Sequence, residues 1–84
     1  MEYIILYDVG EIVVKLSEGI IGNEYVVQDI SLPMNLTKRL EALGMTKGTL
    51  IQIVNGKCHG ILIIKLRGTC FALGKNITQN IIVG

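Results

Sequence analysis

Short apolar runs rich in Ile, Leu and Val alternate with turn-forming residues along most of this sequence. Half of the 84 residues are hydrophobic, and ten glycines stand against a single proline. Branched side chains favour strands, and glycine permits the backbone conformations that tight turns need. The sequence therefore predicts one mainly β domain over residues 1–84. Its strands are expected at 3–7, 12–16, 25–32, 49–54, 61–66, 69–73 and 81–83.

One segment has a helical pattern instead. Leu36, Leu40 and Leu43 recur at helical spacing, and charged residues occupy the other side. This pattern predicts a short amphipathic α-helix inserted after the first long strand. Asn35 is expected as its N-cap and Gly44 as the left-handed residue that ends it.

A hairpin is predicted near the C-terminal end. Arg67 and Gly68 form a two-residue turn between two strands, since glycine tolerates the positive φ that such turns need. The resulting register places the larger apolar side chains on one face, which is the expected core. The predicted pairs are Leu66 with Thr69, Ile64 with Phe71 and Leu62 with Leu73.

The remaining connections complete the predicted architecture. Asn55-Gly56 is a turn signal that leads into the loop 57–60, and 74–80 is expected to be a polar connection. The last strand, 81–83, is expected to pair with an early strand and to close the sheet. The pattern alone thus predicts a small, partly open β-barrel.

Charge and composition exclude several classes of partner. The formal net charge is +1, and the Lys and Arg residues are spread over positions 15 to 75, so no basic stripe for nucleic acid is expected. The apolar run at the start is far shorter than the roughly 20 residues that span a bilayer, so no direct membrane insertion is expected. Two cysteines and no signal-peptide pattern indicate a reduced, cytoplasmic setting.

Catalytic constellations are missing from the sequence. It holds one histidine, no glycine-rich phosphate motif, and no nucleophile with a matching base. We therefore expect that the protein is not an enzyme.

One cluster of metal-ligand types stands out. Cys58 and His59 are adjacent in a loop, and Cys70 lies in the adjoining hairpin. Thiolate and imidazole ligands suit Zn²⁺ or Fe²⁺, which makes these three residues a candidate transition-metal or iron-sensing site. Adjacent ligands without a second pair lack the spacing of structural zinc sites, and cysteine is often simply a small buried hydrophobe. Both interpretations stay open.

Three blocks of the sequence resemble the FeoA family. Residues 36–49 read LTKRLEALGMTKGT, which is similar to the family's basic helix, Leu-Gly-Met and turn ending in Gly-Thr. Before this block, Leu16-Ser17-Glu18 and Gly22 precede a hydrophobic strand. After it, an Arg-Gly turn is followed by Phe-Ala-Leu-Gly-Lys at 71–75. The resemblance covers about residues 16–83 and leaves 1–15 as an N-terminal β extension.

This resemblance implies an SH3-like β-barrel that serves bacterial ferrous iron transport. FeoA-type proteins are accessories of the FeoB-type membrane GTPase permease and are expected to act on its cytoplasmic part. The domain is also similar to the C-terminal SH3-like domain of iron-dependent repressors, although no helix-turn-helix precedes it here. The extension 1–15 either completes the barrel or pairs with another subunit, so a homo-oligomer is an open alternative.

Partner-binding residues are expected around the family-like block. Lys38 and Arg39 give the predicted helix a cationic side, and Leu43 and Met45 lie at its end. Together they form a compact docking surface in which charged and apolar side chains are neighbours. Met45 is either a core residue or an exposed anchor, because methionine serves both roles.

Overall fold

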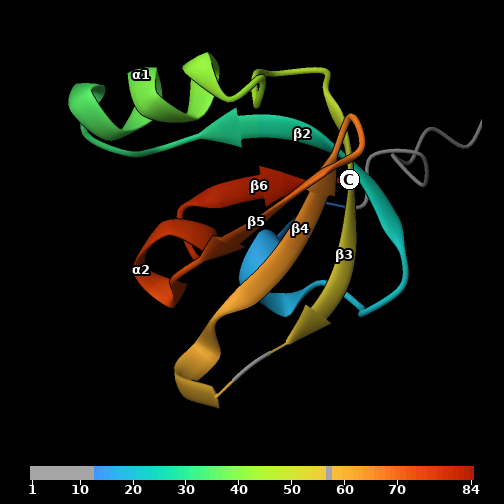
Figure 1. The fold of residues 1–84 in the computed structure, drawn as a ribbon. Coiled ribbons are helices and arrows are strands. Elements are labelled where there is room, and N and C mark those ends of the chain that lie inside the picture. Colours follow the sequence, from blue (N-terminus) through green and yellow to red (C-terminus); the bar gives the residue numbers. More distant parts are fainter. Residues whose placement is uncertain (1–12, 57) are drawn as a thin grey trace, which may run out of the picture.

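The computed structural model describes residues 13–56 and 58–84. Six strands lie in one antiparallel sheet with the order β1-β6-β2-β3-β4-β5, and α1 lies between β2 and β3 as predicted (Figure 1). The predicted strand 3–7 lies outside the described residues. The elements are β1 (Val14–Lys15), η2 (Leu16–Glu18), β2 (Glu24–Ile30), α1 (Met34–Ala42), β3 (Leu50–Gly56), η3 (Cys58–Gly60), β4 (Leu62–Leu66), β5 (Thr69–Leu73), α2 (Lys75–Thr78) and β6 (Ile81–Val83).

Strand β2 joins the two halves of the sheet. Its first residues, Glu24 to Val26, pair with β3, and its later residues, Val27 to Ile30, pair with β6. A register shift between Val27 and Asp29 interrupts the pairing with β6 near this changeover, and bulges of this kind bend a strand. The sheet therefore folds around the core, as the curved course of β2 shows (Figure 1).

The predicted barrel is not closed. The last strand, β6, does pair with the early strands β1 and β2, as expected. The strand order nevertheless begins at β1 and ends at β5, and these two strands do not pair within the described part of the chain. Within the described residues β1 is only two residues long and its partner is β6, so it offers at most two residues for a further ladder with β5.

The β4–β5 hairpin has the predicted register throughout, with Leu66 opposite Thr69, Ile64 opposite Phe71 and Leu62 opposite Leu73. Its turn residues Arg67 and Gly68 have φ values of 51° and 83°. Two successive positive φ angles define the type I′ turn, whose twist matches that of the flanking strands. The apolar face of this hairpin joins the core, as predicted.

The core lies inside the folded sheet and is made almost entirely of branched aliphatic side chains. Alternation along each strand selects them, because successive side chains point to opposite faces. In β3, for example, Ile51 and Ile53 are buried whereas Leu50 and Val54 are exposed. The buried apolar residues are Leu16, Val27, Leu40, Met45, Ile51, Ile53, Ile64, Leu66, Leu73, Ile81 and Val83.

Three local predictions were wrong. Helix α1 begins at Met34 with Pro33 as its N-cap, because the Pro33 carbonyl accepts the N–H groups of Leu36 and Thr37, each at 3.0 Å. Asn55-Gly56 continues β3 instead of turning, since both residues pair with β4. The segment predicted as a polar connection contains the short helix α2, whose Thr78 is fully buried.

The β4–β5 turn gives a stability test. We expect Arg67→Asn to raise the free energy of unfolding by about 0.5–1 kcal/mol, since asparagine tolerates a positive φ better than arginine does. Gly68→Ala should lower it by about 1–2 kcal/mol, because alanine is strained at φ 83°. Urea unfolding measures both changes, and equal stability of the two variants would contradict the turn assignment.

Candidate functional site

The family-like block 36–49 folds into α1 and the turn that follows it. The Met45 N–H donates to the Leu40 carbonyl and the Gly44 N–H to the Glu41 carbonyl, both at 2.9 Å. With Gly44 at φ 100°, these two bonds form a Schellman motif, which also brings the side chains on either side of the turn together. Gly44 is thus the predicted left-handed residue, and the turn directs Met45 into the core.

The turn is also attached to the sheet. The Gly48 N–H donates to the Val27 carbonyl at 2.8 Å, and the Val27 N–H donates to the Thr49 carbonyl at 2.9 Å. The Thr49 hydroxyl donates to the Gly44 carbonyl at 3.3 Å. These bonds fix the C-terminal end of α1 relative to the middle of β2.

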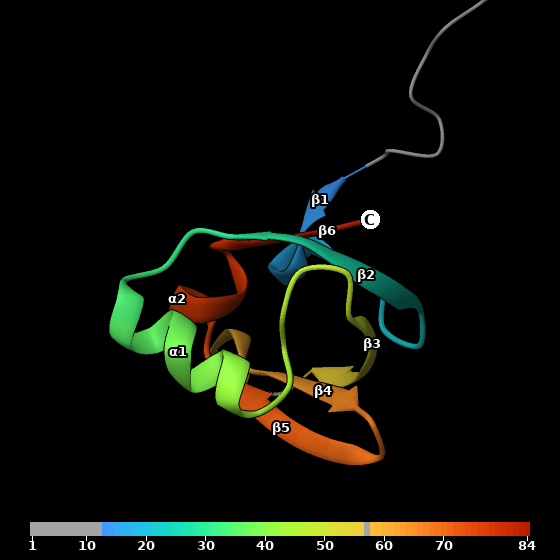
Figure 2. The same ribbon diagram turned by 90° about the horizontal axis from the view of Figure 1, so that it is seen from above.

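A pocket of about 220 Å³ opens between α1, the end of β5 and α2. In both views the two helices lie at the same end of the molecule (Figure 1 and Figure 2). We call this hollow the helix pocket. It is lined by five apolar residues and one cation: Leu36, Arg39, Leu40, Leu43, Leu73 and Ile77.

Two of the four predicted partner-binding residues lie at the helix pocket. Arg39 and Leu43 both line it, and Leu43 is 47% exposed. Lys38 is exposed but does not line the pocket. Because successive helix residues are turned by about 100°, Lys38 projects from the far side of α1.

Met45 is not available to a partner. Its side chain is 1% exposed and belongs to the core cluster, so its prediction as a docking residue was wrong and its alternative as a core residue was right. The cause is the Schellman motif, which packs the residue after the left-handed glycine against the preceding helix turn.

The three candidate metal ligands are all exposed but are not brought together. Cys58 and His59 lie in η3, before β4, whereas Cys70 lies in β5 opposite Lys65. Cys70 pairs with Lys65, which lies three residues along β4 from Leu62, the first residue of that strand. At the rise of a strand this separation is roughly 10 Å. Among residues 13–56 and 58–84, no group of three or more His, Cys, Asp or Glu side chains is close enough to hold a metal ion.

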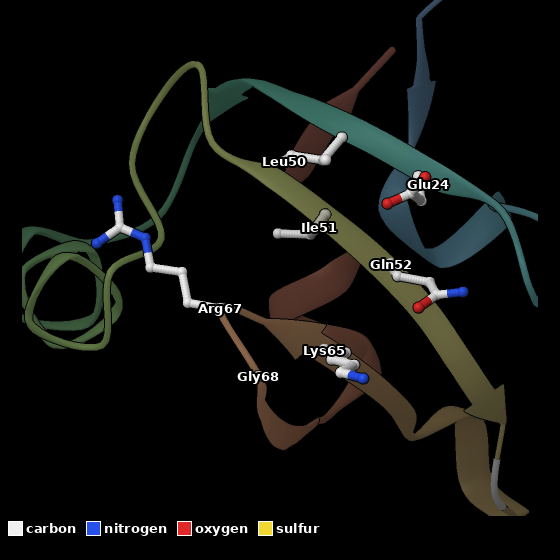
Figure 3. A pocket seen from close by; sticks show the side chains of 7 residues that line it. All are labelled: Glu24, Leu50, Ile51, Gln52, Lys65, Arg67 and Gly68. Carbon is white, nitrogen blue, oxygen red and sulfur yellow. The ribbon is translucent and has the colours of Figure 1, made fainter.

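A second pocket, of about 250 Å³, lies on the outer face of the sheet and was not predicted (Figure 3). Its charged residues come from three different places: Glu24 from β2, Lys65 from β4 and Arg67 from the hairpin turn. Figure 3 shows the Arg67 side chain extending away from Glu24, toward the loop after α1. Its remaining lining residues are Leu50, Ile51, Gln52 and Gly68.

The cationic side chains that line the two pockets form no ion pair within the described residues. The only salt bridge within the described ranges joins Lys47 and Asp29, with 3.3 Å between Nζ and Oδ1, and both side chains are largely exposed. In that part of the chain, Arg39, Lys65 and Arg67 therefore keep their charge free for a ligand.

Comparison with known proteins identifies the family. The model of the FeoA domain matches residues 14–84. This chain belongs to the FeoA family. The predicted resemblance is thereby confirmed, and residues 1–13 lie outside the matched domain.

Solved structures agree with this assignment. The crystal structure of an iron uptake regulatory protein (FeoA) is 33% identical with a TM-score of 0.77, and the match covers 86% of this chain and 96% of that one. FeoA of Stenotrophomonas maltophilia, complexed with zinc and described as an SH3 domain protein, is 28% identical with a TM-score of 0.69, over 84% and 89% of the two chains.

The fold also occurs in a larger protein. A manganese-dependent transcriptional repressor is 16% identical with a TM-score of 0.78, over 86% of this chain and 41% of the repressor. At this identity only the fold is shared. No curated protein sequence matches the chain. Within the described residues, no helix is long and apolar enough to cross a membrane.

The location of Met45 predicts unequal effects of truncating two neighbouring side chains. Met45→Ala should lower the free energy of unfolding by about 2–4 kcal/mol, because it leaves a cavity in the core. Leu43→Ala should cost less than about 1 kcal/mol, since half of that side chain is already exposed. Chemical denaturation of both variants measures the difference, and equal costs would show that Met45 is not a core residue.

The separation of the cysteines predicts that Cys70 contributes nothing to a site at Cys58 and His59. Cys70→Ser should leave the Zn²⁺ affinity of the protein within about twofold of the unmodified value, since an effect below 0.4 kcal/mol is close to none. Equilibrium dialysis measures this affinity, with the double variant Cys58→Ser/His59→Ala as the comparison. A tenfold weaker affinity for Cys70→Ser would show that the three residues do form one site.

Proposed function

We propose that this protein is an accessory of bacterial ferrous iron transport and that it binds the cytoplasmic part of a FeoB-type GTPase permease. The observation that carries the proposal is the helix pocket, an apolar hollow beside the free cation of Arg39. Support for the pathway comes from family membership and from the 33% identical iron uptake regulatory protein. In this proposal the folded sheet acts as a partly open, SH3-like barrel that holds the pocket rigid.

The helix pocket has the composition of a protein-binding surface. Interfaces derive most of their energy from a few apolar or arginine side chains that become fully buried, and both types are present here. Burying the exposed half of Leu43 would contribute on the order of 1 kcal/mol from its apolar area. Arg39 adds recognition of a carboxylate, which its guanidinium can bind through two hydrogen bonds.

Rigidity is the second property that favours binding. Leu40 anchors α1 to the core, and the hydrogen bonds of the following turn hold its C-terminal end against β2. A preformed surface loses less conformational entropy on association than a mobile one does. The helix pocket is therefore suited to receive a side chain of the permease without rearrangement.

A double variant tests the proposal. Arg39→Glu with Leu43→Ala should weaken binding to the purified permease in lipid nanodiscs by at least about tenfold, which corresponds to 1.4 kcal/mol. The loss arises because the variant removes the apolar anchor and places a negative charge beside the pocket. Biolayer interferometry at two salt concentrations measures the affinity.

Lys38→Glu is the matched control, because it changes charge on the same helix but on the side away from the pocket. We expect its affinity for the permease to stay within about threefold of the unmodified value, since exposed charges contribute little. Equal affinity of the double variant and the unmodified protein would exclude the helix pocket as the interface. Absence of any binding by the unmodified protein would overturn the proposed function itself.

A further inference from the structure

Within residues 13–56 and 58–84, strand β5 ends the sheet and has a free edge. It is five residues long and pairs there only with β4, whereas β1, at the other end of the sheet order, is two residues long. A strand at a sheet edge presents unpaired N–H and C=O groups on which another strand can add. Of the two end strands, β5 therefore offers the longer template.

The hairpin register shows which backbone groups face outward. A two-residue turn makes its flanking residues, Leu66 and Thr69, a hydrogen-bonded pair, and such pairs alternate along an antiparallel ladder. The residues between them on β5, Cys70 and Ala72, consequently direct their N–H and C=O groups away from β4. Outside the strand ladders, neither residue makes a backbone hydrogen bond within residues 13–56 and 58–84.

The charged residues in and next to the β4–β5 hairpin are all basic. No acidic residue follows Glu41 in the sequence. Lys65 is the cross-strand partner of Cys70, while Arg67 and Lys75 lie just before and just after β5. The pocket on the outer face of the sheet is lined by one acidic residue, Glu24 on β2. Two strands separate β2 from β5.

These charges argue against a second copy of the chain as the added strand. Antiparallel pairing of two β5 edges with the twofold axis at Phe71, the middle residue of the strand, would place Cys70 opposite Ala72 of the other copy. In that register Arg67 and Lys75 of the two copies come together at both ends of the ladder, and like charges opposite each other destabilise a sheet. An acidic strand would meet the same cations with favourable charge complementarity.

Strand β5 also reaches the helix pocket, because Leu73, its last residue, lines that pocket. We propose that the free edge of β5 binds an extended, acidic segment of the permease by strand addition, with an apolar side chain of that segment in the helix pocket. The inference rests on the proposed function and specifies the kind of segment that is recognised. In this binding mode, main-chain hydrogen bonds supply affinity and alternate side chains supply specificity.

Amide hydrogen exchange tests the strand addition directly. We would measure exchange at Cys70 and Ala72 by NMR in the free protein and in the complex with the permease in nanodiscs. Both outward N–H groups should exchange at least about tenfold more slowly in the complex, since a new hydrogen bond protects them. Retained permease binding without this protection would overturn the inference and leave the proposed function standing.

Two variants and a matched control extend the test. Ala72→Pro removes one outward N–H, which an edge strand tolerates, and Lys65→Glu/Lys75→Glu reverses the flanking charge. Each should weaken permease binding by about tenfold or more, whereas Lys15→Glu/Lys47→Glu, with the same net charge, should change it by less than about threefold. Equal losses in the two double variants would show that only net charge matters.

The free protein provides the remaining comparison. Analytical ultracentrifugation should show a monomer in which Cys70 and Ala72 exchange rapidly. A dimer with both amides already protected would identify a second copy as the occupant of the edge and would overturn the inference. If the unmodified protein did not bind the permease at all, both the inference and the proposed function would be refuted.

Discussion

The turn from Leu40 to Met45 determines how this small domain is organised. Gly44 adopts the left-handed conformation, which lets the N–H groups of Gly44 and Met45 bond back to the last turn of α1. The chain then reverses and places Met45 in the core, while Leu43 stays at the surface. A residue with a side chain at position 44 would be strained, so this single glycine links the helix, the core and the helix pocket.

The division of β2 between two partners has an equally direct consequence. Because one half of β2 pairs with β3 and the other half with β6, the six strands wrap around a common core without a closed ladder. Closure would remove both sheet edges, and within the described residues its absence leaves the edge of β5 unpaired. The last residue of the same strand, Leu73, lines the helix pocket together with residues of α1 and α2.

Local signals in the sequence predicted the elements whose geometry depends on near neighbours. The β4–β5 register follows from alternation and from one Arg-Gly turn, and α1 follows from three leucines at helical spacing. The start of α1 did not follow, because the helix begins at Met34, before the Asn35 expected as its cap, and its N-cap Pro33 makes no side-chain hydrogen bond. Helix α2 was missed because four residues carry too little periodicity to be recognised.

The lining of the helix pocket was predictable only in part for a related reason. Arg39 and Leu43 lie in the family-like block, from which they were predicted as partner-binding residues. Leu73 and Ile77 come from β5 and α2, far along the sequence from α1, so no local pattern connects them with α1. The candidate metal ligands show the opposite case: Cys58 and His59 are adjacent in the sequence, but the strand pairing places Cys70, from the adjoining hairpin, away from them.

The central claim is that the pocket side of α1 faces the permease. Photo-crosslinking tests it most directly, with benzoylphenylalanine placed at position 43, beside the helix pocket, or at position 38, on the far side of the helix. The account predicts a covalent adduct with the cytoplasmic part of the permease from position 43 and none from position 38. An adduct from position 38 alone would show that the opposite side of α1 forms the interface and would contradict the account.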